Sequence, residues 1–399
     1  MLKQLRVVYA IGPEGVIEAY KSWKKGEDAA SQVSMTFSGH FYDVCTALDA
    51  KGYVIAEAAE AEVVQDERFI IERRPVFLGK ARGIFYHLRQ IVRGLQLLVS
   101  AIKFDANVVI ADSGTTYWFI LLLFPWFGIK VIPSLHCTLW RKYSKQTLGE
   151  KITLKLSRSL FISECHSIHA VSHDIAEQIS QLTGGVHRPI HEFLPIYRRS
   201  DFADIAPPCK ERLPLRILFA GRVEYDKGVF DLLEIAKRIA SNSSGSKYQI
   251  VFDICGDGTA LESLRTEVKN KGVEDLFVFH GYCNKQQMRE MFGKSHVVIV
   301  PTRTDFIEGF NRVVAESILS GRPVVTSAVC PALSYVREAV IEVPPNDIEA
   351  YTVALIELYN NPTIYEEKRL ACLKLQEQFY DIKRSWAAAL ESSLSAINI

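Results

Sequence analysis

Two carboxylates, Glu308 and Glu316, lie eight residues apart in the segment 297–327, which reads VVIVPTRTDFIEGFNRVVAESILSGRPVVTS. The pattern predicts a buried strand, a polar loop, a helix that opens at residues 309–311 and a second strand after residues 321–323. Amide groups at a helix start bind anions, and Glu308 beside them could accept hydrogen bonds from hydroxyl groups. Glu316 lies inside an apolar run, where an unpaired carboxylate would be costly. The segment therefore has the groups to hold a ligand that carries phosphate and hydroxyl groups.

This pair also has a purely structural interpretation. Glu308 would then stabilise the dipole of the helix, and Glu316 would be a solvated surface charge. For two glutamates chosen at random the structural interpretation would be the better one. The functional interpretation therefore needs support from residues elsewhere in the chain.

Two basic residues, Arg222 and Lys227, lie between a predicted strand at 215–220 and a predicted helix at 228–240. Cations on such a loop are suited to a diphosphate, because arginine can bind two oxygens at once and lysine acts as a point charge. Taken alone, the pair is explained equally well as solvated loop charges near helix caps. The pattern GxxxxGK[ST] of a P-loop is absent from the sequence.

Glycine-containing turns follow two further predicted strands. The segment 255–259, CGDGT, matches only half of the GxGxxG fingerprint. A turn in which Asp257 and Thr259 cap the next helix explains it at least as well. Gly281 would let a planar base approach the backbone beside Tyr282, and a plain strand-end turn is the alternative.

The elements that must position these side chains are predicted to alternate between strand and helix. In the second half, strands are predicted at 215–220, 249–255, 276–279, 297–301 and 323–326, and helices at 228–240, 259–270, 285–294 and 309–320. In the first half, strands are predicted at 5–11, 69–72, 107–111, 130–135 and 168–171, and helices at 84–103, 115–127, 148–162 and 173–182. This alternation is typical of parallel, doubly wound sheets.

The predicted fold class is therefore α/β, with two Rossmann-like doubly wound domains that face each other across a cleft. The first domain is assigned to residues 1–200 and the second to residues 214–375, joined by a polar, proline-rich linker at 201–213. The tail, 365–395, is predicted as a long amphipathic helix. A cleft between two such domains is the usual place for a ligand.

The composition, with 48% hydrophobic and 23% charged residues, is that of a soluble globular enzyme. Residues 1–200 hold 24 Lys/Arg against 19 Asp/Glu, and residues 201–399 hold 23 against 27. Because acids accompany the basic residues nearly everywhere, no nucleic acid is expected as a partner. The run 141–158 differs, with six basic residues and one acid. A patch for peripheral membrane contact and a solvated helix face explain it equally well.

The expected location is the cytoplasm, with the inner face of the plasma membrane as a variant. The eight cysteines are scattered without a CxxC pair, which fits a reducing compartment. The N-terminus, MLKQLRVVYAIG, lacks the pattern of a signal peptide. The most apolar segment, 117–127, is too short to span a bilayer and is predicted as a buried helix.

The second half of the chain contains four motifs, in the order GRVEYDKG, CGDG, HGY and PTRTDFIEGFNRVVAESILSGRPVV. As an ordered set they resemble the motifs of the retaining glycosyltransferases of family 4. The match covers nearly all of residues 215–345, and the spacing of Glu308 and Glu316 is its most specific part. The resemblance implies the GT-B architecture, with a terminal helix at 376–399 that crosses back onto the first domain. It also implies transfer of a sugar from a nucleoside diphosphate with retention at the anomeric carbon.

The resemblance implies a role for each matching residue. Arg222 and Lys227 would bind the donor diphosphate. Glu316 would bind the nucleotide ribose, and Glu308 would face the donor sugar near the reacting centre. No metal is expected, because a DxD motif is absent and the two cations can replace it. The segment 327–332 departs from the Gly-Gly pair that the family often has there. The other implied donor contacts are Gly221, Gly281, Tyr282, Gly309, Phe310, Asn311 and Arg312.

The facing wall of the cleft is less well defined by the sequence. The family often has a histidine like His136 at the end of a strand, facing the donor sugar; a histidine satisfied locally is the alternative. A glycine after the first strand is also expected to approach the diphosphate. Gly39 is favoured over Gly12 and Gly15, because it opens a predicted helix. Residues 13–37 would then be an insertion that shapes acceptor specificity. Roughly the first twenty of them are expected to be exposed, because they are rich in charged residues.

On family frequency the donor is expected to be a UDP-sugar, with glucose or a relative as the sugar. The acceptor would be a saccharide or a lipid-linked oligosaccharide in cell-envelope or exopolysaccharide synthesis. The alternatives are a nucleotide-sugar epimerase, an inverting GT-B enzyme and a non-catalytic nucleotide-sugar-binding subunit. The first two lack the spacing of Glu308 and Glu316. The third is disfavoured because Arg222 and Lys227 are also in place.

Overall fold

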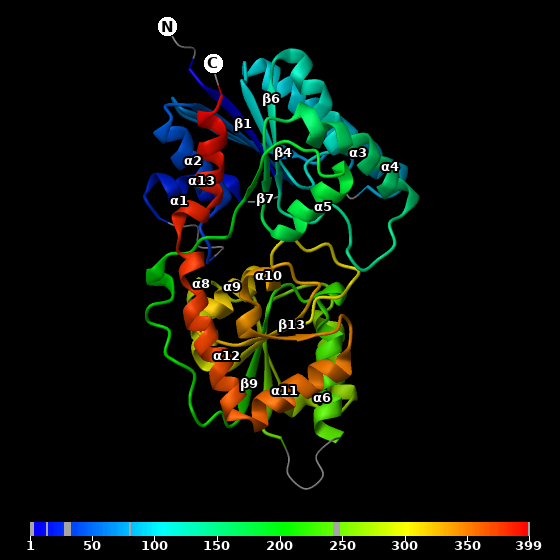
Figure 1. Ribbon diagram of the computed structural model, residues 1–399, viewed down its shortest axis with the longest axis vertical. Coiled ribbons are helices and arrows are strands. Elements are labelled where there is room, and N and C mark those ends of the chain that lie inside the picture. Colours follow the sequence, from blue (N-terminus) through cyan, green and yellow to red (C-terminus); the bar gives the residue numbers. More distant parts are fainter. Residues whose placement is uncertain (1–3, 13–14, 28–32, 80, 242–247, 398–399) are drawn as a thin grey trace.

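The computed structural model describes residues 4–12, 15–27, 33–79, 81–241 and 248–397. It shows two α/β domains, each built around its own sheet (Figure 1). The chain fills the first domain, passes to the second, and returns to the first with its last helix. The fold class predicted from the alternation of strands and helices is confirmed.

The first domain contains an eight-stranded sheet in the order β3-β4-β2-β1-β5-β6-β7-β8. Only the pairing of β3 with β4 is antiparallel. The central strands β1, β5 and β6 are buried on both faces, which is why they read as apolar runs. The strands are β1 (Arg6–Ile11), β2 (Lys51–Ala58), β3 (Glu62–Gln65), β4 (Phe69–Pro75), β5 (Val108–Asp112), β6 (Lys130–Leu135), β7 (Ile168–Ala170) and β8 (Ile190–Glu192).

The helices of this domain are α1 (Val16–Lys24), α2 (Phe37–Ala47), α3 (Ile84–Lys103), α4 (Leu148–Ser159) and α5 (His173–Thr183). The expectation of an exposed excursion after the first strand is wrong for its described part. Helix α1 buries Val16, Ile17 and Tyr20 and packs against α2 and β4. Residues 13, 14 and 28–32 of that predicted insertion lie outside the described residues.

The apolar segment expected as a buried helix is the 3₁₀ helix η1 (Trp118–Phe127). Pro125 has no N–H to donate to a helical ladder. Leu121 and Phe124 are buried, but the end of the segment is not, since Trp126 is 81% exposed. Across the described parts of the chain, no helix is both long enough and apolar enough to cross a membrane.

The second domain contains six parallel strands in the order β11-β10-β9-β12-β13-β14. The strands are β9 (Leu215–Ala220), β10 (Ile250–Cys255), β11 (Phe277–Gly281), β12 (Val297–Val300), β13 (Val324–Ser327) and β14 (Val340–Val343). The helices are α6 (Val229–Ser241), α7 (Leu261–Asn270), α8 (Lys285–Lys294), α9 (Arg312–Leu319), α10 (Leu333–Val336), α11 (Ile348–Asn360) and α12 (Pro362–Leu375).

The tail is not the single long helix that its pattern predicts. Helix α12 ends at Leu375, two short 3₁₀ turns follow, and α13 (Trp386–Ser395) begins after the cap Ser385, which accepts a hydrogen bond from Ala388 N. The break lets α13 lie along α2 of the first domain (Figure 1). Trp386 is fully buried there, donates from Nε1 to Ser134 Oγ at 3.0 Å and stacks on Tyr9.

Candidate nucleotide-sugar site

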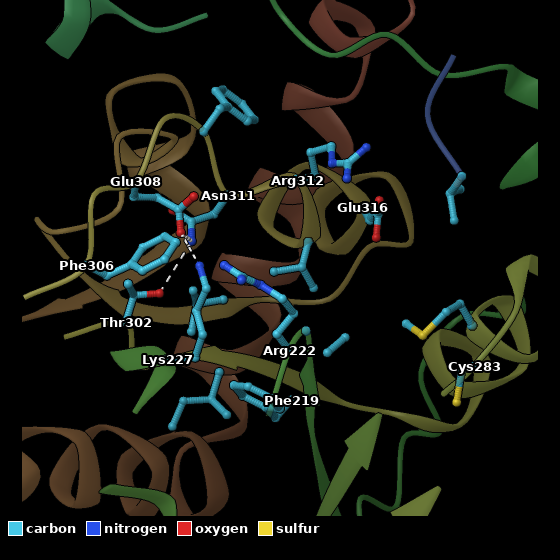
Figure 2. Close-up of a pocket in the computed structure, with 18 of the residues that line it drawn as sticks. Phe219, Arg222, Lys227, Cys283, Thr302, Phe306, Glu308, Asn311, Arg312 and Glu316 are labelled. Atoms are coloured by element: carbon cyan, nitrogen blue, oxygen red, sulfur yellow. Dashed lines mark hydrogen bonds and ion pairs between the residues drawn. The ribbon is translucent and has the colours of Figure 1, made fainter. Parts of the chain in front are cut away.

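A cavity of about 460 Å³ opens beside the ends of β9 and β12. The strand order reverses at this point, because the chain continues from β9 to β10 on one side and reaches β12 on the other. Loops on the two sides of such a reversal diverge and leave a crevice at the carboxyl ends of the strands. Side chains from these loops and from α9 turn into the cavity (Figure 2).

A salt bridge between Lys227 and Glu308 occupies one end of the cavity (Figure 2). Lys227 Nζ lies 2.6 Å from Glu308 Oε2, and the two side chains are only 16% and 14% exposed. Asn311 Nδ2 donates to the same oxygen at 2.8 Å, and the Phe306 ring centroid lies 3.6 Å from Lys227 Nζ. These charge-assisted bonds fix the orientation of the Glu308 carboxylate.

Arg222 follows β9 and is the second cation of the cavity. Its guanidinium carbon lies 5.6 Å from the Phe306 ring centroid. Unlike Lys227, it has no ion-pair partner within the described ranges, and its side chain is exposed to the cavity. Lys227 and Glu308 compensate each other, whereas Arg222 interacts with Glu224 only through space. Its guanidinium therefore keeps its hydrogen-bond donors available to an anion.

Asn311 carries an unsatisfied group into the same place. The residue is 6% exposed, and its Oδ1 accepts no hydrogen bond from the described protein. A buried carbonyl without a partner is costly, so this oxygen is suited to a hydroxyl or N–H donor of a ligand. The expected helix start at 309–311 is wrong, because Asn311 is the cap and α9 begins at Arg312.

Gly309 contacts the opposite domain instead of starting a helix. A Cβ atom at this position would lie 1.8 Å from the carbonyl oxygen of His136. Next to this contact, Thr138 N donates to the Glu308 carbonyl at 3.2 Å. Only glycine allows the two backbones to approach so closely. The loop before α9 and the segment after β6 are therefore in direct contact beside Glu308.

The His136 ring belongs to a polar cluster in the first domain. Its Nε2 lies 2.9 Å from Ser134 Oγ and 3.1 Å from Asp112 Oδ1, and the Tyr9 hydroxyl donates to Asp112 Oδ2 at 2.9 Å. A histidine satisfied locally was the alternative to a histidine that contacts the sugar, and Nε2 does have such local partners. Nδ1, in contrast, is buried with no partner among the described residues. Sequence reasoning missed Asp112, although a polar residue at a strand's carboxyl end is a usable signal.

Glu316 lies on the other side of Arg222 from Glu308 (Figure 2). Burial raises the pKa of its carboxyl above the ordinary value, although nearby Arg312 and a hydrogen bond from Tyr197 act in the opposite direction. The Tyr197 hydroxyl lies 3.4 Å from Glu316 Oε1 and 3.3 Å from the Arg312 carbonyl. The sequence analysis did not predict that Tyr197 contacts Glu316, because this tyrosine lies at the edge of the predicted linker, outside any motif.

Most of the predicted site residues are brought together by the structure. The cavity is lined by Gly221, Arg222, Lys227, Tyr282, Glu308, Phe310, Asn311, Arg312 and Glu316. Gly281 lies directly before Tyr282 and has a positive φ of 67°. Phe306 and Thr302 also line the cavity and were missed, since neither type is distinctive in a loop.

Gly39 and His136 are not among the residues that line this cavity. Gly39 lies in the first turn of α2 and lines a separate cavity of about 570 Å³. Gly12 and Gly15 line neither of the two. The approach of Gly39 to a diphosphate therefore stays a prediction without support from this arrangement.

The CGDG motif serves loop packing. A Cβ at Gly256 would lie 1.8 Å from the Gly221 carbonyl oxygen, so the glycine lets the loops after β9 and β10 touch. The expected capping by Asp257 and Thr259 is wrong, because α7 begins after Ala260 without a side-chain cap. Thr259 N instead donates to Glu224 Oε1 at 3.0 Å.

Two parallel-sheet domains around a cleft with paired carboxylates and cations define a GT-B protein. Residues 209–378 match the family described as "Glycosyl transferases group 1". The match covers the second domain, where the motifs that resemble this family of glycosyltransferases lie.

Known proteins agree with this assignment at low identity. The chain is 21% identical over 286 residues to a glycogen synthase of Mycobacterium tuberculosis, covering 69% of this chain and 66% of that protein. It is 28% identical over 147 residues to the O-antigen chain mannosyltransferase C of Escherichia coli, covering 36% and 37%. The matches therefore span less than two thirds of these relatives. Among solved structures, Anabaena Alr3699/HepE in complex with UDP has a TM-score of 0.68 at 13% identity, covering 98% of this chain and 100% of that one.

Proposed function

We propose that the protein transfers a sugar from a nucleotide-sugar donor to an acceptor hydroxyl with retention of configuration. The observation that supports this best is the content of one cavity. It combines the cation Arg222, the Lys227–Glu308 pair and the unsatisfied Asn311 oxygen, with Glu316 on the far side. A diphosphate needs the cations, and a sugar and a ribose need carboxylate and amide oxygens as partners.

In this proposal the two cations stabilise the leaving group. Negative charge grows on the diphosphate as the bond between the anomeric carbon and the phosphate oxygen breaks. Arg222 and Lys227, already in place, stabilise that charge without reorganisation. Lys227 and Asn311 hold Glu308 through one oxygen, so Oε1 is available to a hydroxyl of the donor sugar.

The acceptor hydroxyl attacks the same face that the leaving group departs from. Its proton passes to the departing phosphate oxygen, its oxygen bonds to the anomeric carbon, and the nucleoside diphosphate is released. No pair of carboxylates is then required as nucleophile and acid, unlike in most glycosidases. Glu316 keeps the nucleotide in register through the ribose hydroxyls. An α-linked product from an α-linked donor supports this scheme, and an inverted product contradicts it.

The donor is proposed to be a UDP-sugar, with glucose or a relative as the sugar. A structural neighbour, HepE, is solved with UDP, which supports the nucleotide. The relative named O-antigen chain mannosyltransferase supports a role in cell-envelope polysaccharides with a saccharide or lipid-linked acceptor. The test is a thermal-shift screen of UDP-, GDP- and ADP-sugars, since a ligand of the folded state raises the melting temperature. The absence of a shift with all three contradicts the donor site.

No metal ion is required in this proposal, because Arg222 and Lys227 supply the positive charge. Activity that persists in EDTA supports it, whereas complete loss restored by magnesium contradicts it. Loss of transfer in Lys227→Ala and Glu308→Ala excludes a non-catalytic subunit. The proposed location is the cytoplasm at the inner face of the plasma membrane. The eight free cysteines fit a reducing compartment.

A further inference from the structure

Helix α3 is apolar on two faces. One face, with Leu97, Leu98 and Ala101, is buried in the core of the first domain. The other is exposed along the length of the helix, from Ile84 at 77% to Ile102 at 43%. A helix needs only one apolar face to pack onto a soluble domain, so the fold does not account for the second. The exposed stripe consists of Ile84, Phe85, Leu88, Leu95, Val99 and Ile102.

Two neighbouring elements extend this apolar stripe. Helix α4 exposes Leu148, Ile152 and Leu156 at intervals of one helical turn, by 75%, 51% and 51%. The end of η1, which contacts both helices, exposes Trp126 and Phe127. These residues together with the α3 stripe are called the α3–α4 face. Among the described residues, 25 large apolar side chains are exposed, and twelve of them lie on α3, α4 and η1 when Tyr86 of α3 is included. Such a concentration marks an interaction surface.

The charges around the α3–α4 face have one sign. Residues 79–103 include five Lys/Arg and no acid, and residues 141–158 include six Lys/Arg and one acid. Lys151, Lys155 and Arg158 are exposed on α4 beside its apolar stripe. An apolar stripe flanked by basic residues is typical of helices that lie in the surface of a membrane with anionic lipids.

A second copy of the chain fits this face less well than a bilayer does. A twofold contact would bring each basic segment close to its own copy, and like charges oppose such a contact. Anionic headgroups instead complement the lysines while the acyl chains accept the apolar stripe. Exposed tryptophan, as at position 126, is also favoured at the boundary between water and lipid. Helices α3 and α4 lie on the side of the first domain away from α1, α2 and α13, so the fold leaves them accessible (Figure 1).

A cavity of about 380 Å³ lies between α3 and α4. Tyr86 of α3 lines it on one side and Thr153 of α4 on another, and its inner end is formed by Cys137, Thr138 and Ile307. These inner residues stand next to the contact in which Thr138 N donates to the Glu308 carbonyl. The inner end of the cavity is thus next to the loop that carries Glu308.

One wall of this cavity carries polar groups among a mainly apolar lining. Gln90 lines it, is 4% exposed, and its Oε1 accepts no hydrogen bond from the described residues. Ser113 and Thr116 lie on the same wall. An unpaired buried carbonyl needs a donor from a ligand, and a sugar hydroxyl supplies one.

We propose that the α3–α4 face inserts into the surface of an anionic bilayer and that the cavity beside it admits the sugar head of a lipid-linked acceptor. The first statement stands on the surface alone. The second rests on the proposed glycosyltransferase function and specifies its acceptor class. The lipid tail would remain in the bilayer while the head group reaches Glu308 through the cavity.

The docking test is co-sedimentation of the full chain with vesicles of phosphatidylcholine plus phosphatidylglycerol, and with vesicles of phosphatidylcholine alone. The wild type is expected to bind the anionic vesicles more tightly. Leu148→Glu/Ile152→Glu is expected to weaken this binding about 100-fold, because each change removes an exposed apolar anchor. Lys151→Gln/Lys155→Gln is expected to weaken it about tenfold on the anionic vesicles only. The matched control is Val353→Glu/Leu370→Glu, two exposed apolar residues of the second domain, which should bind as the wild type does.

Donor binding, measured by calorimetry with UDP-glucose on the same proteins, separates the two hypotheses. Intact donor binding without vesicle binding by the wild type overturns the docking proposal and leaves the proposed function standing. Vesicle binding without binding of any nucleotide sugar overturns the proposed function and leaves docking standing. A wild-type dimer that Leu148→Glu/Ile152→Glu converts to a monomer, with no vesicle binding, assigns the face to a second copy and overturns the proposal.

The cavity is tested with octyl glucoside below its micelle concentration. Saturable binding is expected in the wild type and is expected to fall at least about tenfold in Thr153→Phe, which fills the cavity from α4. Tyr86→Arg, at the exposed rim, is the second variant if the first does not fold. Equal binding by the wild type and a folded variant, or no binding by the wild type, overturns the acceptor route.

Discussion

The two domains that form the walls of the cleft are built in different ways. On the second domain, the donor cavity is made of charged groups that are already positioned, with Lys227, Glu308 and Asn311 bonded to one another. On the first domain, the α3–α4 face is apolar and exposed, and the cavity beside it contains Gln90, whose Oε1 has no partner among the described residues. The difference indicates that the donor chemistry is fixed by a few polar side chains in motifs. The proposed acceptor side depends on surface shape and apolar area, for which the sequence has no motif.

The largest effect is expected from the donor wall. Lys227→Met is predicted to lower kcat/KM for transfer by roughly 100-fold to 1,000-fold, because in the proposed mechanism it removes a charge that stabilises the leaving group. Steady-state kinetics with a saturating acceptor measures the loss. The control Lys237→Met removes a lysine of α6 that pairs with Glu234 outside the cavity, and its activity should equal that of the wild type. Equal losses in both variants would indicate a general charge effect and remove the distinction between the walls.

The contact between the walls is tested by Gly309→Ala. The new Cβ would lie 1.8 Å from the His136 carbonyl, so one backbone must shift. Overpacking of this kind is predicted to lower the free energy of unfolding by about 1–3 kcal/mol and to reduce transfer. Chemical denaturation measures the first effect. Gly293→Ala, where a Cβ meets no atom within 4 Å, is the control and should not destabilise the protein. An unchanged Gly309→Ala protein would show that the two walls can separate freely.

The sequence could predict the elements that follow a hydrophobic or charge pattern, but not the surfaces and helix ends that lack one. The parallel sheets followed from apolar runs that alternate with helices. The grouping of Arg222, Lys227, Glu308 and Glu316 around one cavity followed from cations and carboxylates in the loops after strands. Helix α1 was misjudged because its charges hide a buried face, and the helix start at Arg312 because Asn311 takes the capping position. The exposure of the α3–α4 face could not be predicted, because no motif marks it. Apolar residues on a helix have the same pattern whether the helix packs on protein, on lipid or on another copy of the chain.

Glu316→Gln is expected to have an intermediate effect on UDP affinity and a pH-dependent effect on stability. The carboxylate should bind ribose hydroxyls better than an amide does, so affinity for UDP should fall about tenfold. Burial raises the pKa of Glu316 above the ordinary 4.5, so the folded protein holds this proton more tightly than the unfolded chain does. The ionised group therefore disfavours folding at neutral pH, and this penalty is lost as the pH falls through the raised pKa.

Glu316→Gln should accordingly melt at a higher temperature than the wild type at neutral pH, with a gain that shrinks towards acid pH. Its UDP affinity should depend less on pH than that of the wild type. Calorimetry across pH measures both quantities, with exposed Glu262→Gln as the control. A lower melting temperature at neutral pH would mean that the Tyr197 hydrogen bond outweighs the cost of burial.

The smallest effect is expected from Gly39→Ala. The new Cβ would lie 2.9 Å from Thr36 Oγ1 and away from the donor cavity, so UDP affinity should change by no more than about twofold. Calorimetry with UDP decides this. A large loss with normal stability would restore Gly39 to the donor site and would mean that the domains close further around the nucleotide than they do here.

Trp386 has a consequence for the order in which the molecule can form. This side chain completes the core of the first domain, between Tyr9 and Ser134, although it follows the entire second domain in sequence. During synthesis, a chain stopped before residue 386 would have two nearly finished sheets and an apolar gap in the earlier one. Contacts that join such distant residues form late and slowly. The final folding step of the first domain thus waits for the last helix to leave the ribosome.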